Sequence, residues 1–236
     1  MEDLIVLELK FEYEGTMKIL YPVLLKGAEG YVLVDCGYPG FLDLLEKEIN
    51  HKGIDPGAIS AIYLTHQDND HMGAAREFLD RYPHVKIITS KEEAPYISGK
   101  KKNLRLLQAE AFLETLPDEK KDFGLRFCER LKKVKPVAVD LEVRGDDFFD
   151  WAGGSQVIFT PGHTPGHTSI YLKKYNTVIT GDAAVIEKGE LILANPQFCL
   201  DLEQAERSFE KLITMDAKRY ICYHGGIYEP APSNRA

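Results

Sequence analysis

Histidine and aspartate are concentrated in one short segment of the chain. His66, Asp68, Asp70 and His71 lie within six residues and directly follow the apolar run 61–64. Imidazole nitrogens and carboxylate oxygens are donors that bind transition-metal ions in proteins. A short apolar run of this kind predicts a strand. The segment therefore predicts a set of metal ligands at the end of a strand.

Three more clusters of metal-ligand side chains follow at or near the ends of strand-like runs, at residues 160–167, 180–182 and 222–226. They contribute His163, His167, Asp182 and His224. Five of the seven histidines of the chain lie in these clusters and in the first one. The four clusters together predict one metal site assembled from several strand ends.

Alternation of strands and helices is predicted around these clusters. Apolar runs predict strands at residues 4–11, 19–25, 31–35, 59–64, 85–89, 137–143, 156–160, 168–173, 177–180 and 219–222. Apolar residues at helical spacing predict helices at residues 39–52, 73–82 and 201–215, the last with Asp201 as its N-cap. This order favours an α/β fold, and we expect a single domain over residues 1–236.

Residues 91–134 differ from the flanking chain by their higher charge and helical periodicity. We expect an inserted helical segment that covers one edge of the site, the alternative being an ordinary pair of surface helices. Its basic residues, 100–102 and Arg105, are expected to lie in a solvated loop and helix start. We expect the segment to control substrate choice rather than metal binding.

Composition excludes several classes of protein. The chain has 236 residues, 44% hydrophobic and 28% charged, with a formal net charge of −8, which argues against nucleic acid as a partner. Residues 1–8 do not resemble a signal peptide, and no apolar run reaches the roughly 20 residues that span a bilayer. The four cysteines are scattered and fit reduced thiols. We expect a cytoplasmic protein that binds a small molecule and no membrane, and that can form a homodimer.

The order of the clusters resembles the metallo-β-lactamase superfamily. The Asp-x-Gly strand end, the H-x-H-x-D-H loop, the G-H-T-P-G segment, the Gly-Asp bridging site and the final His-Gly of the family match residues 35–37, 66–71, 162–166, 181–182 and 224–225. Each motif alone is weak, but five in order are specific. The resemblance covers most of the chain and implies an αββα sandwich.

The resemblance also implies the metal ligands. His66, Asp68 and His163 would form the first site, and Asp70, His71 and His224 the second, with Asp182 bridging both. The implied cofactors are two divalent transition-metal ions, chosen among zinc, manganese and iron.

Asp68 departs from the family pattern, because most members have histidine at this position. Asp68, Asp70, Asp182 and one hydroxide would cancel the four charges of two divalent ions, and a carboxylate is a harder donor than imidazole. We therefore expect manganese or iron to be preferred over zinc, and Asp68→His to tighten zinc binding. The alternative is that Asp68 only hydrogen-bonds a ligand histidine.

Other residues near the clusters are expected to have structural roles. Asp35 should orient a ligand or a turn, and His167 should be a buried hydrogen-bonding residue outside the metal shell. Cys222 is expected to be a core thiol. Four residues are expected to be packing aromatics or surface histidines without a function: Tyr223, Tyr228, His51 and His84.

The resemblance implies a dinuclear metallo-hydrolase. A metal-bound hydroxide, held by Asp70 and Asp182 as catalytic residues, would attack a small intracellular ester, thioester or lactone. The alternatives are a phosphodiesterase, a site that only senses a ligand, and an iron-dependent oxidoreductase of the same superfamily, because flavodiiron enzymes carry glutamate where Asp68 stands.

Absent features narrow these alternatives. We expect neither the glutathione-binding helical domain of glyoxalase II nor the flavin domain of a flavodiiron enzyme in this chain. Val185 stands where acyl-homoserine lactonases have tyrosine. The acidic balance offers no basic groove for a ribonuclease. An ester or thioester hydrolase is therefore the favoured interpretation.

Overall fold

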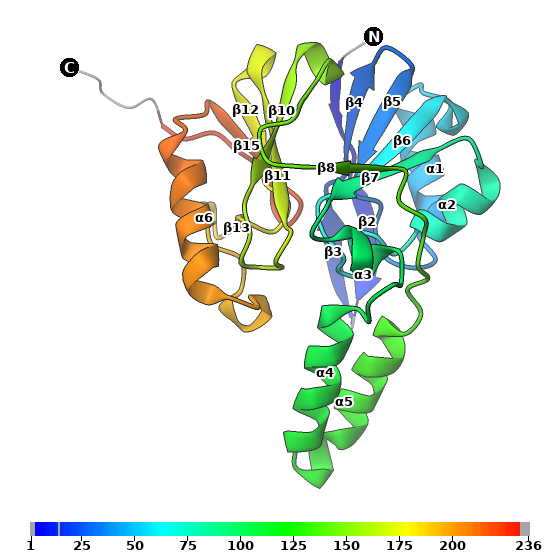
Figure 1. Ribbon diagram of the computed structural model, residues 1–236, viewed down its shortest axis with the longest axis vertical. Helices are drawn as coiled ribbons and strands as arrows, with labels where there is room; N and C mark the ends of the chain where they lie inside the picture. Colours follow the sequence, from blue (N-terminus) through cyan, green and yellow to red (C-terminus); the bar gives the residue numbers. More distant parts are fainter. Residues whose placement is uncertain (1–2, 14, 232–236) are drawn as a thin grey trace.

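Two six-stranded sheets face each other in the computed structural model, which describes residues 3–13 and 15–231 (Figure 1). Sheet one has the order β1 (Leu4–Val6), β4 (Val23–Gly27), β5 (Gly30–Val34), β6 (Ile59–Leu64), β7 (Lys86–Ser90) and β8 (Leu141–Val143). Sheet two has the order β16 (Gly226–Tyr228), β15 (Arg219–Cys222), β12 (Thr177–Ile179), β11 (Thr168–Leu172), β10 (Ser155–Phe159) and β9 (Phe148–Phe149).

Helices cover the outer faces of both sheets. α1 (Leu42–His51) and α2 (Ala75–Arg81) pack on sheet one, and α6 (Leu202–Thr214) packs on sheet two. These bounds agree with the predicted helices to within three residues. The Asp201 side chain accepts the backbone N–H of Gln204 at 3.0 Å, which is the predicted N-cap bond. The four layers form the αββα sandwich that the resemblance implied.

Buried strands carry apolar side chains on both faces. In β5, Tyr31 and Leu33 pack into the core under α1 and α2, whereas Val32 and Val34 pack into the core between the two sheets. Successive side chains of a strand point to opposite faces, so a strand buried on both sides must be apolar throughout. Strands held in this way on both faces give the residues at their ends a fixed position.

Three of the predicted strands are wrong in extent: the strand predicted at 137–143 is reduced to β8, and the other two are each divided in the structure. Residues 4–11 contribute to β1 and to β2 (Leu9–Tyr13), and residues 19–25 contribute to β3 (Thr16–Leu20) and to β4. Pro22, between β3 and β4, has no N–H to continue a strand ladder. β2 and β3 instead pair with each other as a separate two-stranded ribbon.

The predicted helical segment at 91–134 contains α3 (Ala94–Ile97), α4 (Leu104–Thr115) and α5 (Asp118–Leu131). α4 and α5 pack against each other through a small core of Ala109, Cys128 and Leu131, and this hairpin projects from the sandwich (Figure 1). The remaining short elements are β13 (Val185–Glu187), β14 (Glu190–Ile192) and 3₁₀ helices at Pro56–Ala58, Trp151–Gly153, Lys173–Tyr175 and Pro196–Phe198. Among the helices described, none combines the length and the apolar character needed to cross a membrane.

Candidate metal centre

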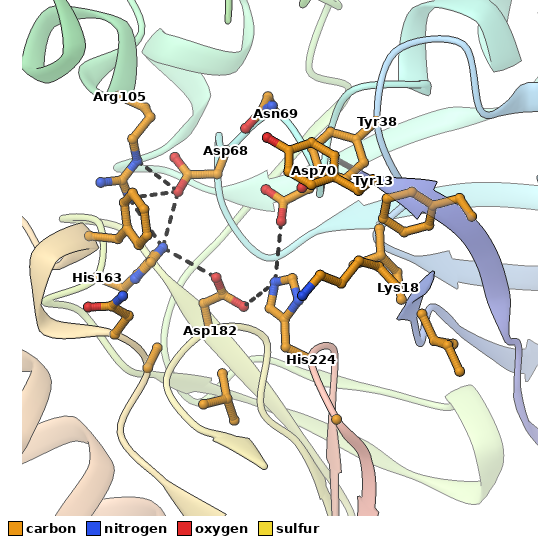
Figure 2. Close-up of a pocket in the computed structure, with 18 of the residues that line it drawn as sticks. Tyr13, Lys18, Tyr38, Asp68, Asn69, Asp70, Arg105, His163, Asp182 and His224 are labelled. Atoms are coloured by element: carbon orange, nitrogen blue, oxygen red, sulfur yellow. Dashed lines mark hydrogen bonds and ion pairs between the residues drawn. The ribbon is translucent and has the colours of Figure 1, made fainter. Parts of the chain in front are cut away.

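The predicted ligands from four strand ends meet beside one cavity. Residues 66–71 follow β6, His163 follows β10, Asp182 follows β12 and His224 follows β15. β6 is parallel to its neighbour β5, and β12 is parallel to its neighbour β15. Parallel strands end at the same edge of a sheet, which is why segments far apart in the sequence meet here. Figure 2 shows the ligands that line this cavity.

The second predicted site consists of four converging donor atoms. Asp182 Oδ1 lies 3.3 Å from His71 Nε2 and 3.4 Å from His224 Nε2. Asp70 Oδ2 lies 3.3 Å from His224 Nε2 and 3.9 Å from His71 Nε2. Tetrahedral donors that are each about 2.1 Å from an ion lie about 3.4 Å from one another. The four atoms therefore have the spacing that one transition-metal ion needs.

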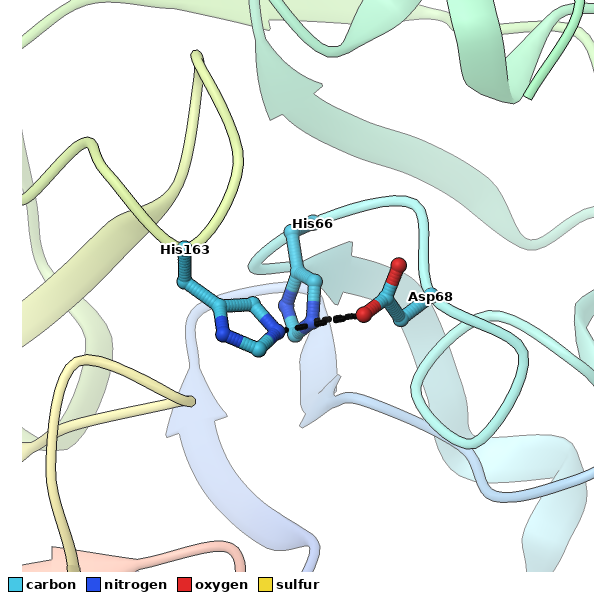
Figure 3. A group of neighbouring side chains, drawn as sticks. All are labelled: His66, Asp68 and His163. Atoms are coloured by element: carbon cyan, nitrogen blue, oxygen red, sulfur yellow. Dashed lines mark hydrogen bonds and ion pairs between the residues drawn. The ribbon is translucent and has the colours of Figure 1, made fainter. Parts of the chain in front are cut away.

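The first predicted site has similar spacing (Figure 3). Asp68 Oδ2 lies 3.1 Å from His163 Nε2 and 3.6 Å from His66 Nε2. Asp182 Oδ2 completes the set, at 3.4 Å from His163 Nε2 and 4.0 Å from His66 Nε2. The structure thus brings all seven predicted ligands together, and Asp182 directs one oxygen to each site. That arrangement suits a bridging carboxylate.

Unsatisfied polar atoms support metal binding at this place. His66 Nε2, His71 Nε2 and Asp182 Oδ1 belong to the converging donor sets, are buried, and have no hydrogen-bond partner among the described residues. Buried polar atoms are rarely left unpaired in folded proteins. Divalent transition-metal ions would satisfy these acceptors, so the donor set fits such ions chemically.

His167 fixes the position of Asp182 without joining either site. Its Nε2 accepts the backbone N–H of Asp182 at 2.9 Å, and its Nδ1 lies 2.9 Å from the Thr160 hydroxyl. Burial and the neighbouring histidines hold the pKa of His167 well below its usual range, so the ring is neutral. Gly181 has φ +54°, and a Cβ there would lie 2.5 Å from His167 Nε2. His167 therefore has the buried hydrogen-bonding role expected for it.

Asp35 orients a ligand of the second site, as the sequence predicted. Its Oδ2 lies 2.8 Å from His71 Nδ1 and accepts the Thr65 hydroxyl at 2.8 Å, while its Oδ1 accepts the backbone N–H of Thr65 at 2.9 Å. A proton on His71 Nδ1 leaves Nε2 free to bind an ion.

Tyr223 does more than the expected packing. Its hydroxyl donates to the Asp70 carbonyl at 2.6 Å and accepts the backbone N–H of Gly37 at 3.0 Å, so it ties the ligand-bearing loop of Asp70 to the loop that carries Asp35. Cys222 is a buried thiol in the core under α6. The remaining candidates lie away from the ligands: Tyr228 packs on the same core, His51 pairs with Glu48, and His84 hydrogen-bonds the carbonyls of residues 57 and 59.

Sequence reasoning missed Glu93, which connects the loops of the first site. This side chain is fully buried and accepts the backbone N–H of Gln67 at 3.0 Å and that of Gly166 at 2.8 Å. The chain at Gly166 approaches so closely that a Cβ there would lie 2.7 Å from the Glu93 nitrogen. Glu93 thereby fixes the loop of His66 against the loop of His163.

Glu93→Gln should change how stability depends on pH. Burial raises the pKa of Glu93 from 4.5 to about 7, so the folded protein keeps this proton up to about pH 7 while the unfolded chain loses it near pH 4.5. Stability should therefore fall as pH rises through this window, by on the order of 3 kcal/mol. Urea unfolding of metal-free protein at pH 5 and pH 7.5 measures the difference.

The variant should show a smaller difference between the two pH values, and at pH 5 it should be less stable than wild type. A glutamine offers one acceptor oxygen to two backbone donors, so one of them loses its bond. Glu92→Gln, at the neighbouring exposed residue, is the matched control. Equal pH dependence in wild type and Glu93→Gln would contradict this assignment.

Arg105 corrects the expectation of a solvated basic run. Its side chain is only 4% exposed, and its Nη2 and Nε donate to Asp68 Oδ2 at 2.7 and 3.1 Å. Nη2 also lies 3.3 Å from His163 Nε2 (Figure 2). Burial alone would raise the pKa of Asp68, but the Arg105 charge helps hold it well below its usual range.

The Arg105 contact changes two interpretations made from sequence. The charge balance of the site gains one buried positive charge, which offsets Asp68 and removes the electrostatic part of the argument for manganese or iron; donor hardness remains. The helical segment also takes part in the site directly, because both Arg105 and Glu93 come from residues 91–134. Their contacts make it more than a surface helix pair.

A cavity of about 500 Å³ opens beside the ligands. Its floor carries ligands of both sites, and its walls come from the β2–β3 ribbon, the α4–α5 hairpin, and residues 185–187 and 194–198. Both additions to the sandwich, ribbon and hairpin, therefore shape access to the predicted metal site.

The chain belongs to the metallo-β-lactamase superfamily, whose sequence profile matches residues 21–224. Among similar proteins is one named probable metallo-hydrolase YflN from Bacillus subtilis (strain 168), 27% identical over 214 residues that cover 83% of this chain and 75% of that protein. A hydroxyacylglutathione hydrolase from Synechococcus sp. (strain JA-2-3B'a(2-13)) is 25% identical, over 70% of this chain and 48% of that protein.

Two solved structures illustrate the shared fold. Metallo-β-lactamase family protein TTHA1429 from Thermus thermophilus matches with a TM-score of 0.72 and 23% identity, over 96% of this chain and 75% of that one. TTHA1623, solved in a di-iron-bound form, matches with a TM-score of 0.63 and 22% identity, over 89% and 90% of the two chains.

Proposed function

We propose that this protein is a dinuclear, metal-dependent hydrolase of a small ester, thioester or lactone. The observation that carries the proposal is the division of the Asp182 carboxylate, which directs Oδ2 to His66 and His163 and Oδ1 to His71 and His224. Bound divalent ions at these sites would supply Lewis acidity and a nucleophile at neutral pH.

The side chains of the protein would organise the reaction around these ions. His66, Asp68 and His163 would hold one ion, and Asp70, His71 and His224 the other. Asp70 and Asp182 are the carboxylates that face both the second site and the cavity, so they are placed to accept and return a proton during hydrolysis. Asp35, His167 and Tyr223 would hold these groups in position.

The cavity supports a small molecule as the substrate. Its volume of about 500 Å³ is in the range of small-molecule sites, and apolar side chains such as Phe11 and Phe198 contribute to its walls. The similarity to a protein named probable metallo-hydrolase supports hydrolysis, and the similarity to one named hydroxyacylglutathione hydrolase supports a thioester substrate. The match to the hydroxyacylglutathione hydrolase spans about half of the length of that protein.

Hydrolysis by reconstituted protein tests the proposal. We expect protein stripped with a chelator to be inactive. Protein reloaded with zinc, manganese or iron(II) should hydrolyse nitrophenyl esters and acyl thioesters, and it should do so also when molecular oxygen is excluded from the assay. Elemental analysis of the reloaded protein should give two ions per chain. Oxygen-dependent turnover would favour the oxidoreductase, and turnover of a bis-nitrophenyl phosphate but of no ester would favour the phosphodiesterase. Metal binding without turnover would favour a sensing role.

A further inference from the structure

We infer that the cavity selects an anionic substrate and that Arg130 binds its carboxylate or phosphate group. This inference rests on the proposed hydrolase function and names the class of ester that the site takes. Beyond the predicted ligands, Lys18, Arg105 and Arg130 line the cavity, and Glu187 is the acidic residue there among the described residues.

Apart from the predicted ligands, the cavity wall thus carries more positive than negative side chains, whereas the whole chain has a formal net charge of −8. Arg105 is paired with Asp68, so its charge is already offset. Lys18 and Arg130 form no ion pair with any carboxylate in the described parts of the chain, which leaves two positive charges facing the cavity. Cations collected in a cleft attract and retain an anionic ligand.

The guanidinium of Arg130 is held in place by two aromatic rings. It lies 5.1 Å from the ring centre of Tyr13 and 5.6 Å from that of Phe127, and it donates to the Tyr13 hydroxyl. These rings come from different wall elements, β2 and α5. A guanidinium has five N–H groups, so the one bond to Tyr13 leaves donors for a ligand.

Arginine is well suited to this task. Its planar fork binds a carboxylate or phosphate through two parallel hydrogen bonds, and stacking on aromatic rings fixes the fork before the ligand arrives. A partly buried position strengthens the charge–charge attraction compared with open water. Lys18 lines the same cavity as the predicted ligand His224, and in the view of Figure 2 its side chain extends toward that histidine, so the cavity wall carries a second cation.

Arg130 could instead only join the β2–β3 ribbon to the helical hairpin, and the two roles have different consequences. A joining role would affect every substrate equally, whereas an anion-binding role affects only substrates that carry the charge. The comparison therefore needs two esters with the same leaving group and a different acyl charge. p-Nitrophenyl acetate and p-nitrophenyl hemisuccinate meet this requirement. In both, water adds to the acyl carbon, the C–O bond breaks, and nitrophenol and a carboxylic acid are released.

With metal-loaded protein at low salt, we expect kcat/KM for the hemisuccinate to exceed that for the acetate by at least about tenfold. Arg130→Met should lower kcat/KM for the hemisuccinate by about tenfold or more, mainly by raising KM. Its kcat/KM for the acetate should stay within about twofold of the wild-type value. Arg130→Lys should keep part of the preference. Arg126→Met, at an exposed arginine of the same helix, should change neither substrate.

Calorimetry on the metal-loaded protein separates this inference from the proposed function. Succinate and inorganic phosphate should bind more tightly to wild type than to Arg130→Met, whereas the affinity for acetate should be the same in both proteins. Of succinate and phosphate, the anion that loses more affinity in the variant is the preferred one. If neither ester is hydrolysed, the hydrolase proposal fails and the binding comparison still decides the inference. Equal kcat/KM for both esters in wild type, equal losses in Arg130→Met, or affinities for succinate and phosphate that do not depend on Arg130 would overturn it.

Discussion

Asp182→Asn should reduce hydrolysis by at least about a hundredfold and lower the metal content of the protein. The two carboxylate oxygens of Asp182 face different sites, at 3.3 Å from His71 Nε2 and 3.4 Å from His163 Nε2. Asparagine keeps the shape but has one acceptor oxygen, carries no charge, and turns an NH₂ group toward one of the two sites. One ion would lose its shared ligand, and both would lose a neutralising charge.

Elemental analysis and calorimetric metal titration of the variant measure this loss directly, without relying on activity. We expect about one ion per chain at metal concentrations that give two in wild type. Asp80→Asn, at an exposed aspartate of α2, is the matched control and should retain both ions. Full occupancy of both sites in Asp182→Asn would show that this carboxylate does not bridge them.

Much of the fold could be predicted because its signals are local. The helix over 201–215 is marked by an N-cap aspartate and a repeating apolar face, and both features depend only on neighbouring residues. The strand 59–64 appears with the predicted bounds. The division of residues 4–11 between β1 and β2 was missed because it depends on which distant strand each half pairs with. β1 pairs with β4, whereas β2 pairs with β3.

The same limit applies to the site. The ligands stand at strand ends in motifs that can be read from adjacent residues. Arg105 and Glu93 lie 37 and 26 residues from Asp68 and Gln67, the residues that they contact, in a segment whose local pattern is that of a charged helical region. Neither residue type nor spacing shows that an arginine near a lysine run will be buried against a carboxylate. The ion pair between Arg105 and Asp68 can be recognised only once the α4–α5 hairpin has been placed against the loop that follows β6.

Asp68→His should therefore weaken the first metal site, which is the opposite of the result expected from sequence alone. The sequence argument treated residue 68 as an isolated carboxylate, whereas its Oδ2 accepts a hydrogen bond from Arg105 Nη2 at 2.7 Å. With a neutral histidine at position 68, the buried guanidinium of Arg105 would have no carboxylate partner there and would lie close to a divalent ion. Removing one partner of a buried ion pair costs about 3–5 kcal/mol. Urea unfolding of metal-free protein and calorimetric zinc titration measure the two effects.

Combining Asp68→His with Arg105→Met should restore the first site. The double variant has a neutral ligand set with no opposing charge, and zinc should bind at least about tenfold more tightly than in Asp68→His alone, because the repulsion between guanidinium and ion is gone. Arg105→Met alone should also raise first-site affinity in the presence of Asp68, while Arg126→Met should not. The four proteins form a double-mutant cycle in which the coupling between positions 68 and 105 is measured as a difference of zinc affinities. Weaker zinc binding in Arg105→Met than in wild type would mean that the arginine positions Asp68 for the ion rather than opposing it.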